Sequence, residues 1–267
     1  SSLEREKNLM KILLIGDIFG TMGREMIKEN LEEIRTKKGI QFIVANGENI
    51  AHGNGITNNY YKFLLDNHVN IVTLGNHSFA NHDVFNFIDD AKNLIRPLNM
   101  PSGVPGKGYV TLKYNQLTVT VFQVMGRTFM STPLDCPFKK TEELLNSTNS
   151  DIYICDFHGE ATSEKIAFAN YFDGRINIVV GTHTHVQTND ARILPKGTMY
   201  MTDLGMTGPL DGIIGVNPTP IIKRFLTGMP VRHIPMETGP KQLNGLIVEI
   251  NELTHKTTNF EIVNVVK

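Results

Sequence analysis

Two histidines separated by one residue, His183 and His185, follow an apolar run at 176–180 that is typical of a β-strand. Alternate residues on a strand or its exit loop point in different directions, so this segment can hold two neighbouring metal ions. An HxH pair alone is a weak indication, because exposed loop histidines are common. The prediction is strengthened by four further apolar runs that end in ligand-type residues, at Gly16-Asp17, Asn46-Gly47-Glu48-Asn49, Gly75-Asn76-His77 and Asp156-Phe157-His158.

The residue types at these places indicate which metals such a site prefers. Carboxylates, amide oxygens and imidazoles without a thiolate suit Mn, Fe, Co or Zn rather than Cu(I) or a structural zinc cluster. The candidate ligands are too many for one tetrahedral ion, so we expect two ions that share a bridging carboxylate, best supplied by Glu48. The predicted ligands are Asp17, Glu48, Asn49, Asn76, His158, His183 and His185.

The charge of such a centre predicts the kind of substrate. Two divalent ions contribute +4, Asp17 and Glu48 contribute −2 and a bridging hydroxide contributes −1, so the site stays positive and attracts an anionic phosphate ester. Paired ions about 3.5–4 Å apart activate water and stabilise an in-line displacement. His77, next to Asn76, is the candidate general acid that protonates the departing oxygen.

The elements that must position these residues alternate between strand and helix. Apolar runs and amphipathic helical patterns succeed each other through the first two-thirds of the chain, which is typical of an α/β fold. Ligands of such sheets bind where the carboxyl ends of the strands converge. The pattern predicts strands at 11–15, 41–45, 70–74, 151–155 and 176–180, and helices at 22–34, 60–65, 83–94 and 163–171.

The second half of the chain is richer in β pattern. Residues 109–114 and 117–122 flank Asn115-Gln116, which predicts a β-hairpin. Two further strands are expected at 246–250 and 260–265. Together these patterns favour a layered α/β sandwich.

The stretch 205–240 is rich in Gly and Pro and lacks clear periodicity. A loop of this length in a compact domain is usually functional or partly structured. No repeat or linker divides the chain, so we expect one domain over residues 10–267, preceded by a flexible leader at residues 1–9.

Composition limits the function classes. A formal net charge of −1 and a pI near 6.7 argue against a broad nucleic-acid surface. Cys136 and Cys155 form no CxxC pattern, so we expect no disulfide framework and a cytoplasmic protein. Cys155 lies within an apolar strand, which predicts a buried, inert thiol. No run approaches the roughly 20 apolar residues that span a bilayer, so we expect no membrane partner.

At these residues the sequence resembles the calcineurin-like metallophosphoesterases, whose ordered motifs include GD, GNH and GHxH elements. Phe19 stands where the usual first-motif histidine is expected, and Glu48, with Asn49 beside it, replaces the usual second-motif aspartate. These departures resemble the bacterial YmdB-like phosphodiesterases. The same branch is indicated by the stretches GDIFGTMGRE, ANGENIAHGNGI, TLGNHSF, DFHGEATSEK, GTHTHVQTND and MTDLGMTGP.

The resemblance implies a four-layer αββα sandwich and two bridged divalent metal ions, iron or manganese, with zinc or cobalt as alternatives. It also implies hydrolysis of phosphate diesters, including 2′,3′-cyclic nucleotides, by a metal-bridging hydroxide, in an enzyme that is often a homo-oligomer. Asn49 would replace the ligand lost at Phe19. By position, one metal would take Asp17, Glu48, Asn49 and His185, and the other Glu48, Asn76, His158 and His183.

Each of these residues also has an ordinary structural interpretation. Asp17 can cap the following helix, and Asn49 and Asn76 can be turn residues beside glycines. None of these interpretations explains why five segments end in ligand-type residues. Glu160 is either a partner that orients His158 or an ordinary carboxylate at a helix start.

Two other functions stay open. A phosphomonoesterase or nucleotidase would use the same centre and hydrolyse nucleoside monophosphates faster than cyclic diesters. A regulatory RNA- or protein-binding module would hold the metal for structure, although the near-neutral charge counts against broad nucleic-acid binding. The pattern does not identify the native metal or the substrate, nor whether the 205–240 loop or a neighbouring subunit completes the pocket.

Overall fold

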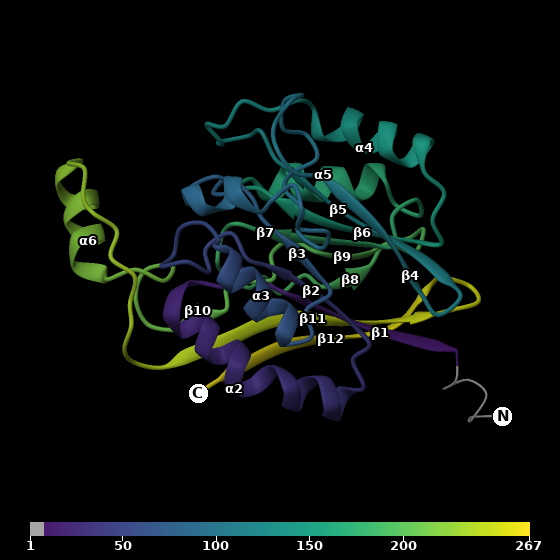
Figure 1. Cartoon of the computed structure of the whole chain (residues 1–267), viewed down its shortest axis with the longest axis horizontal. Helices are drawn as coiled ribbons and strands as arrows, with labels where there is room; N and C mark the ends of the chain where they lie inside the picture. The colour runs from purple at the N-terminus through teal and green to yellow at the C-terminus, as the bar shows by residue number, and fades with distance from the viewer. Residues whose placement is uncertain (1–7) are drawn as a thin grey trace.

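Two β-sheets lie face to face, with helices on their outer sides, in the computed structural model, which describes residues 8–267 (Figure 1). The strands of the first sheet are β1 (Leu9–Ile15), β2 (Phe42–Asn46), β3 (Ile71–Thr73), β10 (Gly208–Pro209), β11 (Lys241–Asn251) and β12 (Thr257–Val266). Their order is β10-β11-β1-β2-β3, and β12 also pairs with β11. Because β1, β2 and β3 run parallel, their carboxyl ends reach the same edge.

The second sheet also has parallel strands at its centre. Its strands are β4 (Tyr109–Tyr114), β5 (Leu117–Met125), β6 (Ile152–His158), β7 (Ile178–Thr182), β8 (Arg192–Ile193) and β9 (Met199–Met201). They follow the order β4-β5-β6-β7-β9-β8, and β5, β6, β7 and β9 are parallel. β2, β6 and β7 are buried along their whole length, as expected for central parallel strands.

The outer layers are helical. Helices α2 (Gly20–Lys38) and α3 (Asn58–Asp66) share an apolar core with the first sheet, and α4 (Pro137–Ser147) and α5 (Thr162–Tyr171) share one with the second. A third core, between the sheets, joins Ile12 and Val44 of one to Val121 and Ile154 of the other. These layers confirm the predicted four-layer αββα sandwich.

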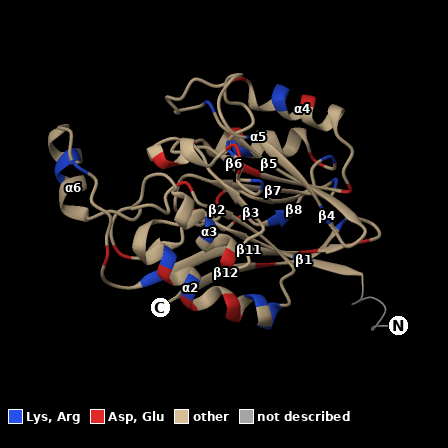
Figure 2. Cartoon of the chain, viewed as in Figure 1, with Lys and Arg blue, Asp and Glu red and all other residues tan. Residues whose placement is uncertain are grey.

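Local sequence explains where the elements end. α2 buries Met22, Met26, Ile27 and Leu31, which recur at helical spacing, and it stops at Gly39, whose φ of 66° is the left-handed conformation that favours glycine. Acidic and basic residues alternate along α2, as the red and blue ribbon segments of Figure 2 show, and two of its ion pairs join Arg35 to Glu32 and Lys37 to Glu33. This mixture fits a solvated helix surface.

The predicted strands, the hairpin and three of the four predicted helices are confirmed, with shifts of a few residues at their ends. The prediction of a helix over 83–94 is wrong. Only a short 3-10 helix, η1 (His82–Asn86), forms there, and Leu94 pairs in parallel with Val72 of β3. Val84, Ile88 and Ala91 are nevertheless buried. The spacing of these apolar residues therefore indicated correctly which side of the segment is buried, although the segment does not form a continuous helix.

The stretch 205–240 is partly structured, as its length suggested. It contains β10 and the helix α6 (Pro218–Thr227), which stands away from the two sheets (Figure 1). Asn217 caps α6 by accepting from the Thr219 N–H. The sequence pattern predicted neither α6 nor α4, which lies earlier in the chain.

The leader expected at residues 1–9 lies mostly outside the described residues, and Leu9 already belongs to β1. Among residues 8–267, no helix combines the length and apolar character needed to cross a membrane.

Candidate metal centre

The predicted site residues lie together where the parallel strands end. Asp17 follows β1, Glu48 and Asn49 follow β2, and Asn76 and His77 follow β3. From the second sheet, His158 is the last residue of β6, and His183 and His185 follow β7. The two sheets therefore contribute to one site, as expected from the convergence of strand ends.

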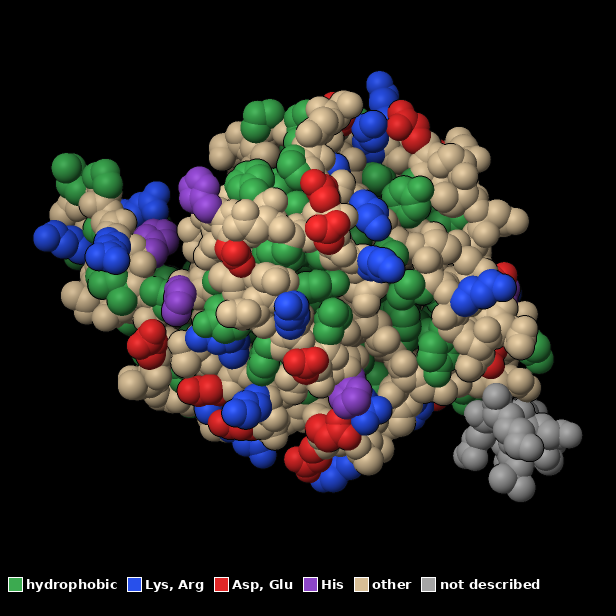
Figure 3. Space-filling model, in the orientation of Figure 1, with side chains coloured by type: hydrophobic (Ala, Val, Ile, Leu, Met, Phe, Trp, Pro, Cys, Tyr) green, Lys and Arg blue, Asp and Glu red, His purple; other side chains and the backbone are tan. Residues whose placement is uncertain are grey.

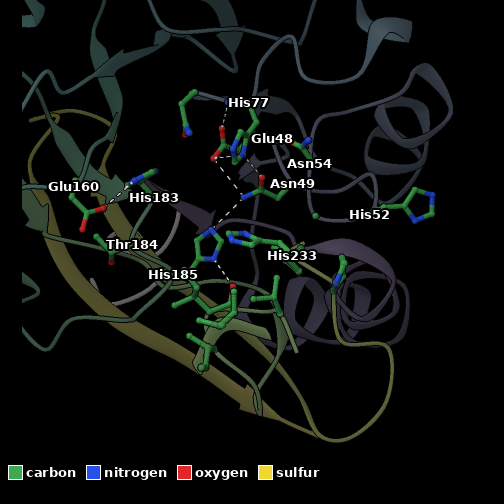
Figure 4. A pocket seen from close by; sticks show the side chains of 18 of the residues that line it. Glu48, Asn49, His52, Asn54, His77, Glu160, His183, Thr184, His185 and His233 are labelled. Carbon is green, nitrogen blue, oxygen red and sulfur yellow. Dashed lines mark hydrogen bonds and ion pairs between the residues drawn. The ribbon is translucent and has the colours of Figure 1, made fainter. Parts of the chain in front are cut away.

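His158 is the centre of this cluster. It is fully buried, and its Nε2 lies 2.9 Å from Glu48 Oε1, 2.8 Å from Asn76 Oδ1 and 3.2 Å from His183 Nδ1. Glu48, His158 and His183 each offer one ligand atom within 4.8 Å of the others, and this group can hold a metal ion. Figure 4 shows Glu48 and His183 turned toward the same cavity.

Asp17 adds a second carboxylate, which is buried without full hydrogen bonding. Its Oδ2 accepts from the backbone N–H of His183 at 3.1 Å. Its Oδ1 has no hydrogen-bond partner among residues 8–267. Burial raises the pKa of Asp17 to about 6. An unsatisfied buried carboxylate oxygen beside three ligand-type side chains is what a cation site provides.

Asn49 connects the remaining predicted residues. Its Oδ1 lies 2.7 Å from His77 Nδ1, and its Nδ2 lies 3.3 Å from His185 Nε2 (Figure 4). An amide nitrogen does not ligate a metal, so Asn49 would become a ligand only with its amide turned to face His185 with oxygen. The structure thus brings Asn49 to the predicted position but with the opposite amide orientation.

Each of the three histidines predicted as metal ligands has its second ring nitrogen held by the protein. His158 Nδ1 lies 2.8 Å from Thr182 Oγ1, His183 Nε2 lies 3.0 Å from Glu160 Oε2, and His185 Nδ1 donates to the Ile214 carbonyl at 3.0 Å. Such partners fix ring orientation in metal sites. Glu160 therefore contacts His183, and the interpretation that it orients His158 is wrong.

Neighbouring charges inside the cluster shift one another's pKa. Burial would raise the pKa of Glu48, but the His158 ring and the His77 backbone N–H lower it to about 2. Burial opposes protonation of His158, yet the Glu48 carboxylate raises the pKa of His158 to about 9. Histidine binds a metal only when unprotonated at the ligating nitrogen, so a cation and a proton compete for His158 Nε2.

The backbone also makes room for this cluster. A Cβ atom at Gly75 would overlap Glu48 Oε2 and His158 Nε2. Glycine is therefore required for the close approach of the loop after β3 to the two side chains. The donor set, the unpartnered Asp17 oxygen and this close packing all fit a bound divalent cation.

Comparison with known proteins places the chain in a family. Residues 13–263 match the family described as YmdB-like protein. The chain belongs to the YmdB-like family. This confirms the resemblance seen in the motifs, and with it the assignment to the metallophosphoesterases.

Curated and solved relatives agree with this assignment. A 2′,3′-cyclic-nucleotide 2′-phosphodiesterase of Bacillus subtilis is 49% identical over 94% of this chain and 96% of its own length. The solved structure of a novel phosphatase from Mycoplasma pneumoniae is 36% identical, with a TM-score of 0.92 over 97% of this chain and 94% of its own. A hypothetical protein from Thermus thermophilus gives 38% identity and a TM-score of 0.91, over 97% of this chain and 100% of its own.

A more distant likeness concerns the fold alone. A putative 5′-nucleotidase from Staphylococcus aureus is 15% identical, with a TM-score of 0.62 over 97% of this chain and 55% of its own. The αββα sandwich of this YmdB-like chain is therefore shared with enzymes of quite different sequence.

A cavity of about 690 Å³ lies in front of the metal-type ligands of this YmdB-like protein. One wall is polar and includes Glu48, Asn76 and His183. A second wall comes from the 205–240 stretch and is largely apolar, with Ile214 and Phe225 both well exposed. In Figure 3, histidine side chains line the side of the molecule that faces α6. The 205–240 stretch therefore shapes the pocket.

The sequence pattern did not predict two buried residues, Lys165 and Asp203, that hold the backbone of the GTHTH segment in place. Lys165 is fully buried and donates to the Thr182 carbonyl at 2.8 Å and to Asp203 Oδ2 at 3.1 Å. Asp203 also accepts from the Thr184 backbone N–H at 3.0 Å. A lysine within a helical sequence gives no sign of burial, so the contacts of Lys165 with Thr182 and Asp203 could be found only in three dimensions.

Proposed function

We propose that this chain is a phosphodiesterase that uses two divalent metal ions to hydrolyse small phosphate diesters, 2′,3′-cyclic nucleotides in particular. The observation that carries the proposal is the convergence of Glu48, His158 and His183 beside the buried, unpartnered Oδ1 of Asp17. The activity named for the Bacillus subtilis relative, which is 49% identical over nearly the full length of both chains, supports the substrate class.

The metal ligands divide into two groups that share Glu48. Asn76, His158 and His183 would hold one ion with it, and the contacts among these side chains support that grouping. The other ion would take Glu48 together with Asp17, Asn49 and His185. When bound, the two ions supply activated water and neutralise charge that develops on the phosphate.

His77 is the group we assign to the leaving oxygen. Its Nδ1 lies 2.7 Å from the side-chain amide of Asn49, and this contact fixes the orientation of the ring. Its Nε2 has no hydrogen-bond partner among residues 8–267, and the side chain is 41% exposed in the cavity. Burial lowers the pKa of His77, so its protonated form gives up the Nε2 proton readily.

The second wall of the cavity suits the nucleoside part of such a substrate. Exposed apolar side chains such as Phe225 offer a surface for a planar base. Arg224 also lines the cavity and forms no ion pair within the described part of the chain, so its charge is free to attract an anionic ligand. A cavity of about 690 Å³ has the size usual for small-ligand sites.

The proposal is tested with metal-stripped protein reloaded with Mn²⁺, Fe²⁺, Zn²⁺ or Co²⁺ and assayed on 2′,3′-cyclic AMP, on bis-p-nitrophenyl phosphate and on AMP. We expect hydrolysis of both diesters, with metal dependence, and its loss in Glu48→Gln and His158→Ala. Diesterase activity that survives in either purified variant contradicts the assignment.

The same panel separates the phosphomonoesterase alternative. That enzyme would hydrolyse AMP faster than either diester in every metal-loaded form. No contact in the cavity favours it over the diesterase, and the name of the Bacillus subtilis relative favours the diesterase.

A further inference from the structure

A series of buried hydrogen bonds leads from His158 of the candidate metal centre to Asp156, which contacts residues of both sheets. His158 Nδ1 lies 2.8 Å from Thr182 Oγ1, and Thr182 Oγ1 donates to Asp156 Oδ1 at 2.6 Å. Asp156 is 3% exposed, Thr182 1% and His158 0%. The pairing of β6 with β7 sets this contact, because His158 lies directly opposite Thr182.

The donors around Asp156 decide the direction of these bonds. Its Oδ2 accepts from Thr73 Oγ1 at 2.6 Å, from Asn46 Nδ2 at 3.1 Å and from Gln123 Nε2 at 3.1 Å. Thr182 donates to the other oxygen. Four donors from four elements thus converge on this carboxyl group, which acts as an acceptor throughout.

The single hydroxyl proton of Thr182 then settles the state of His158. Because that proton points to Asp156, Thr182 Oγ1 can only accept from the histidine, and Nδ1 must be the nitrogen that carries N–H. The ring's other nitrogen, Nε2, faces Glu48, Asn76 and His183. A cation bound among these groups would meet the lone pair of Nε2.

We propose that Thr182 and Asp156 are positioning residues that hold His158 in the Nδ1–H form and aim its Nε2 at the bound metal. The inference rests on the metal centre of the proposed function and adds the groups that orient its most buried ligand. Groups that fix the tautomer and orientation of a metal-ligating histidine strengthen metal binding, and their loss lowers metal affinity about 10–100-fold.

Thr182→Val is the direct test, because valine keeps the shape of threonine and removes only the hydroxyl. The variant leaves His158 Nδ1–H and Asp156 Oδ1 buried without these partners. We expect Mn²⁺ and Zn²⁺ affinity to fall about 10–100-fold, measured by calorimetric titration of metal-stripped protein. Thr182→Ser keeps the hydroxyl and is expected to bind close to the wild-type affinity.

Thr120→Val is the matched control. Thr120 is also a fully buried strand residue, and its hydroxyl bonds to Thr111 at 2.8 Å and Ser150 at 2.6 Å. Its loss should leave metal affinity unchanged. Thermal unfolding followed by circular dichroism checks that each variant is folded.

The outcomes are distinct. Wild-type affinity in Thr182→Val overturns the inference, and so does an equal loss in Thr182→Ser or in Thr120→Val. If Thr182→Val does not fold, Asp156→Asn decides, with reduced affinity supporting the inference and unchanged affinity overturning it. A wild-type protein that binds none of Mn²⁺, Fe²⁺, Zn²⁺ and Co²⁺ overturns the proposed function and this inference with it.

Discussion

Asp17 Oδ2 accepts a hydrogen bond at 3.1 Å from the backbone N–H of His183, a residue 166 positions further along the chain. The contact joins the end of β1 in one sheet to the end of β7 in the other. It also uses one oxygen of Asp17 and leaves Oδ1 buried without a partner among residues 8–267. The same carboxylate therefore ties the two sheets together and offers a free ligand atom to the site.

His77→Asn should reduce kcat for 2′,3′-cyclic AMP about 10²–10⁴-fold, because the leaving alkoxide loses its proton donor. Metal content, measured by mass spectrometry, should stay unchanged. The loss should be smaller for bis-p-nitrophenyl phosphate, whose leaving group needs little protonation. Equal losses on both substrates would contradict the role assigned to His77.

Gly75→Ala should abolish metal binding, since a Cβ atom would overlap Glu48 Oε2 and His158 Nε2. Gly39→Ala is the comparison, because among residues 8–267 no atom beyond the adjoining backbone lies within 4 Å of a Cβ there, and the left-handed φ of 66° costs alanine about 1–2 kcal/mol. Gly39→Ala should thus lower stability yet keep the metal. Calorimetric titration with Mn²⁺ tests both, and normal binding by Gly75→Ala would refute the expectation.

Lys165→Met should lower the free energy of unfolding by about 3–5 kcal/mol, because it leaves Asp203 buried without its cation. Lys37→Met removes an exposed pair with Glu33 and should change stability by less than about 1 kcal/mol. Urea unfolding measures both. Similar changes in the two variants would show that the buried pair has no special role.

Phe225→Ala should raise KM for 2′,3′-cyclic AMP about five-fold, corresponding to about 1 kcal/mol of lost base stacking. Phe129→Ala is a matched control, since Phe129 is 85% exposed, close to the 82% of Phe225, and does not line the cavity. Steady-state kinetics with equal metal loading compares them. An unchanged KM in Phe225→Ala would remove Phe225 from the substrate site.

Cys136 should react with a thiol reagent in the folded protein, whereas Cys155 should not. Cys155 is fully buried, and burial raises the pKa of its thiol well above the usual value, so little reactive thiolate forms. Cys136 is partly exposed. Mass spectrometry should find one modified cysteine before denaturation and two after it, and early labelling of Cys155 would contradict its burial.

Several features were predictable because they depend on local pattern. The apolar runs that became β1, β2, β6 and β7 are long enough to be recognised, and ligand-type residues directly follow or end them. Short or irregular elements were not predictable. α6 and β10 lie in a stretch without periodicity. The helical spacing over 83–94 forms only η1, which is followed by turns before Leu94 pairs with Val72.

The sequence by itself determined the chemical types of the site residues and the strand ends that carry them, because alternation and burial along a strand are properties of neighbouring residues. Only the tertiary structure decided which partner holds each histidine. Thr182 meets His158 through the register of β6 and β7, Glu160 contacts His183, and Ile214 of the 205–240 stretch contacts His185. Such contacts depend on how distant segments pack.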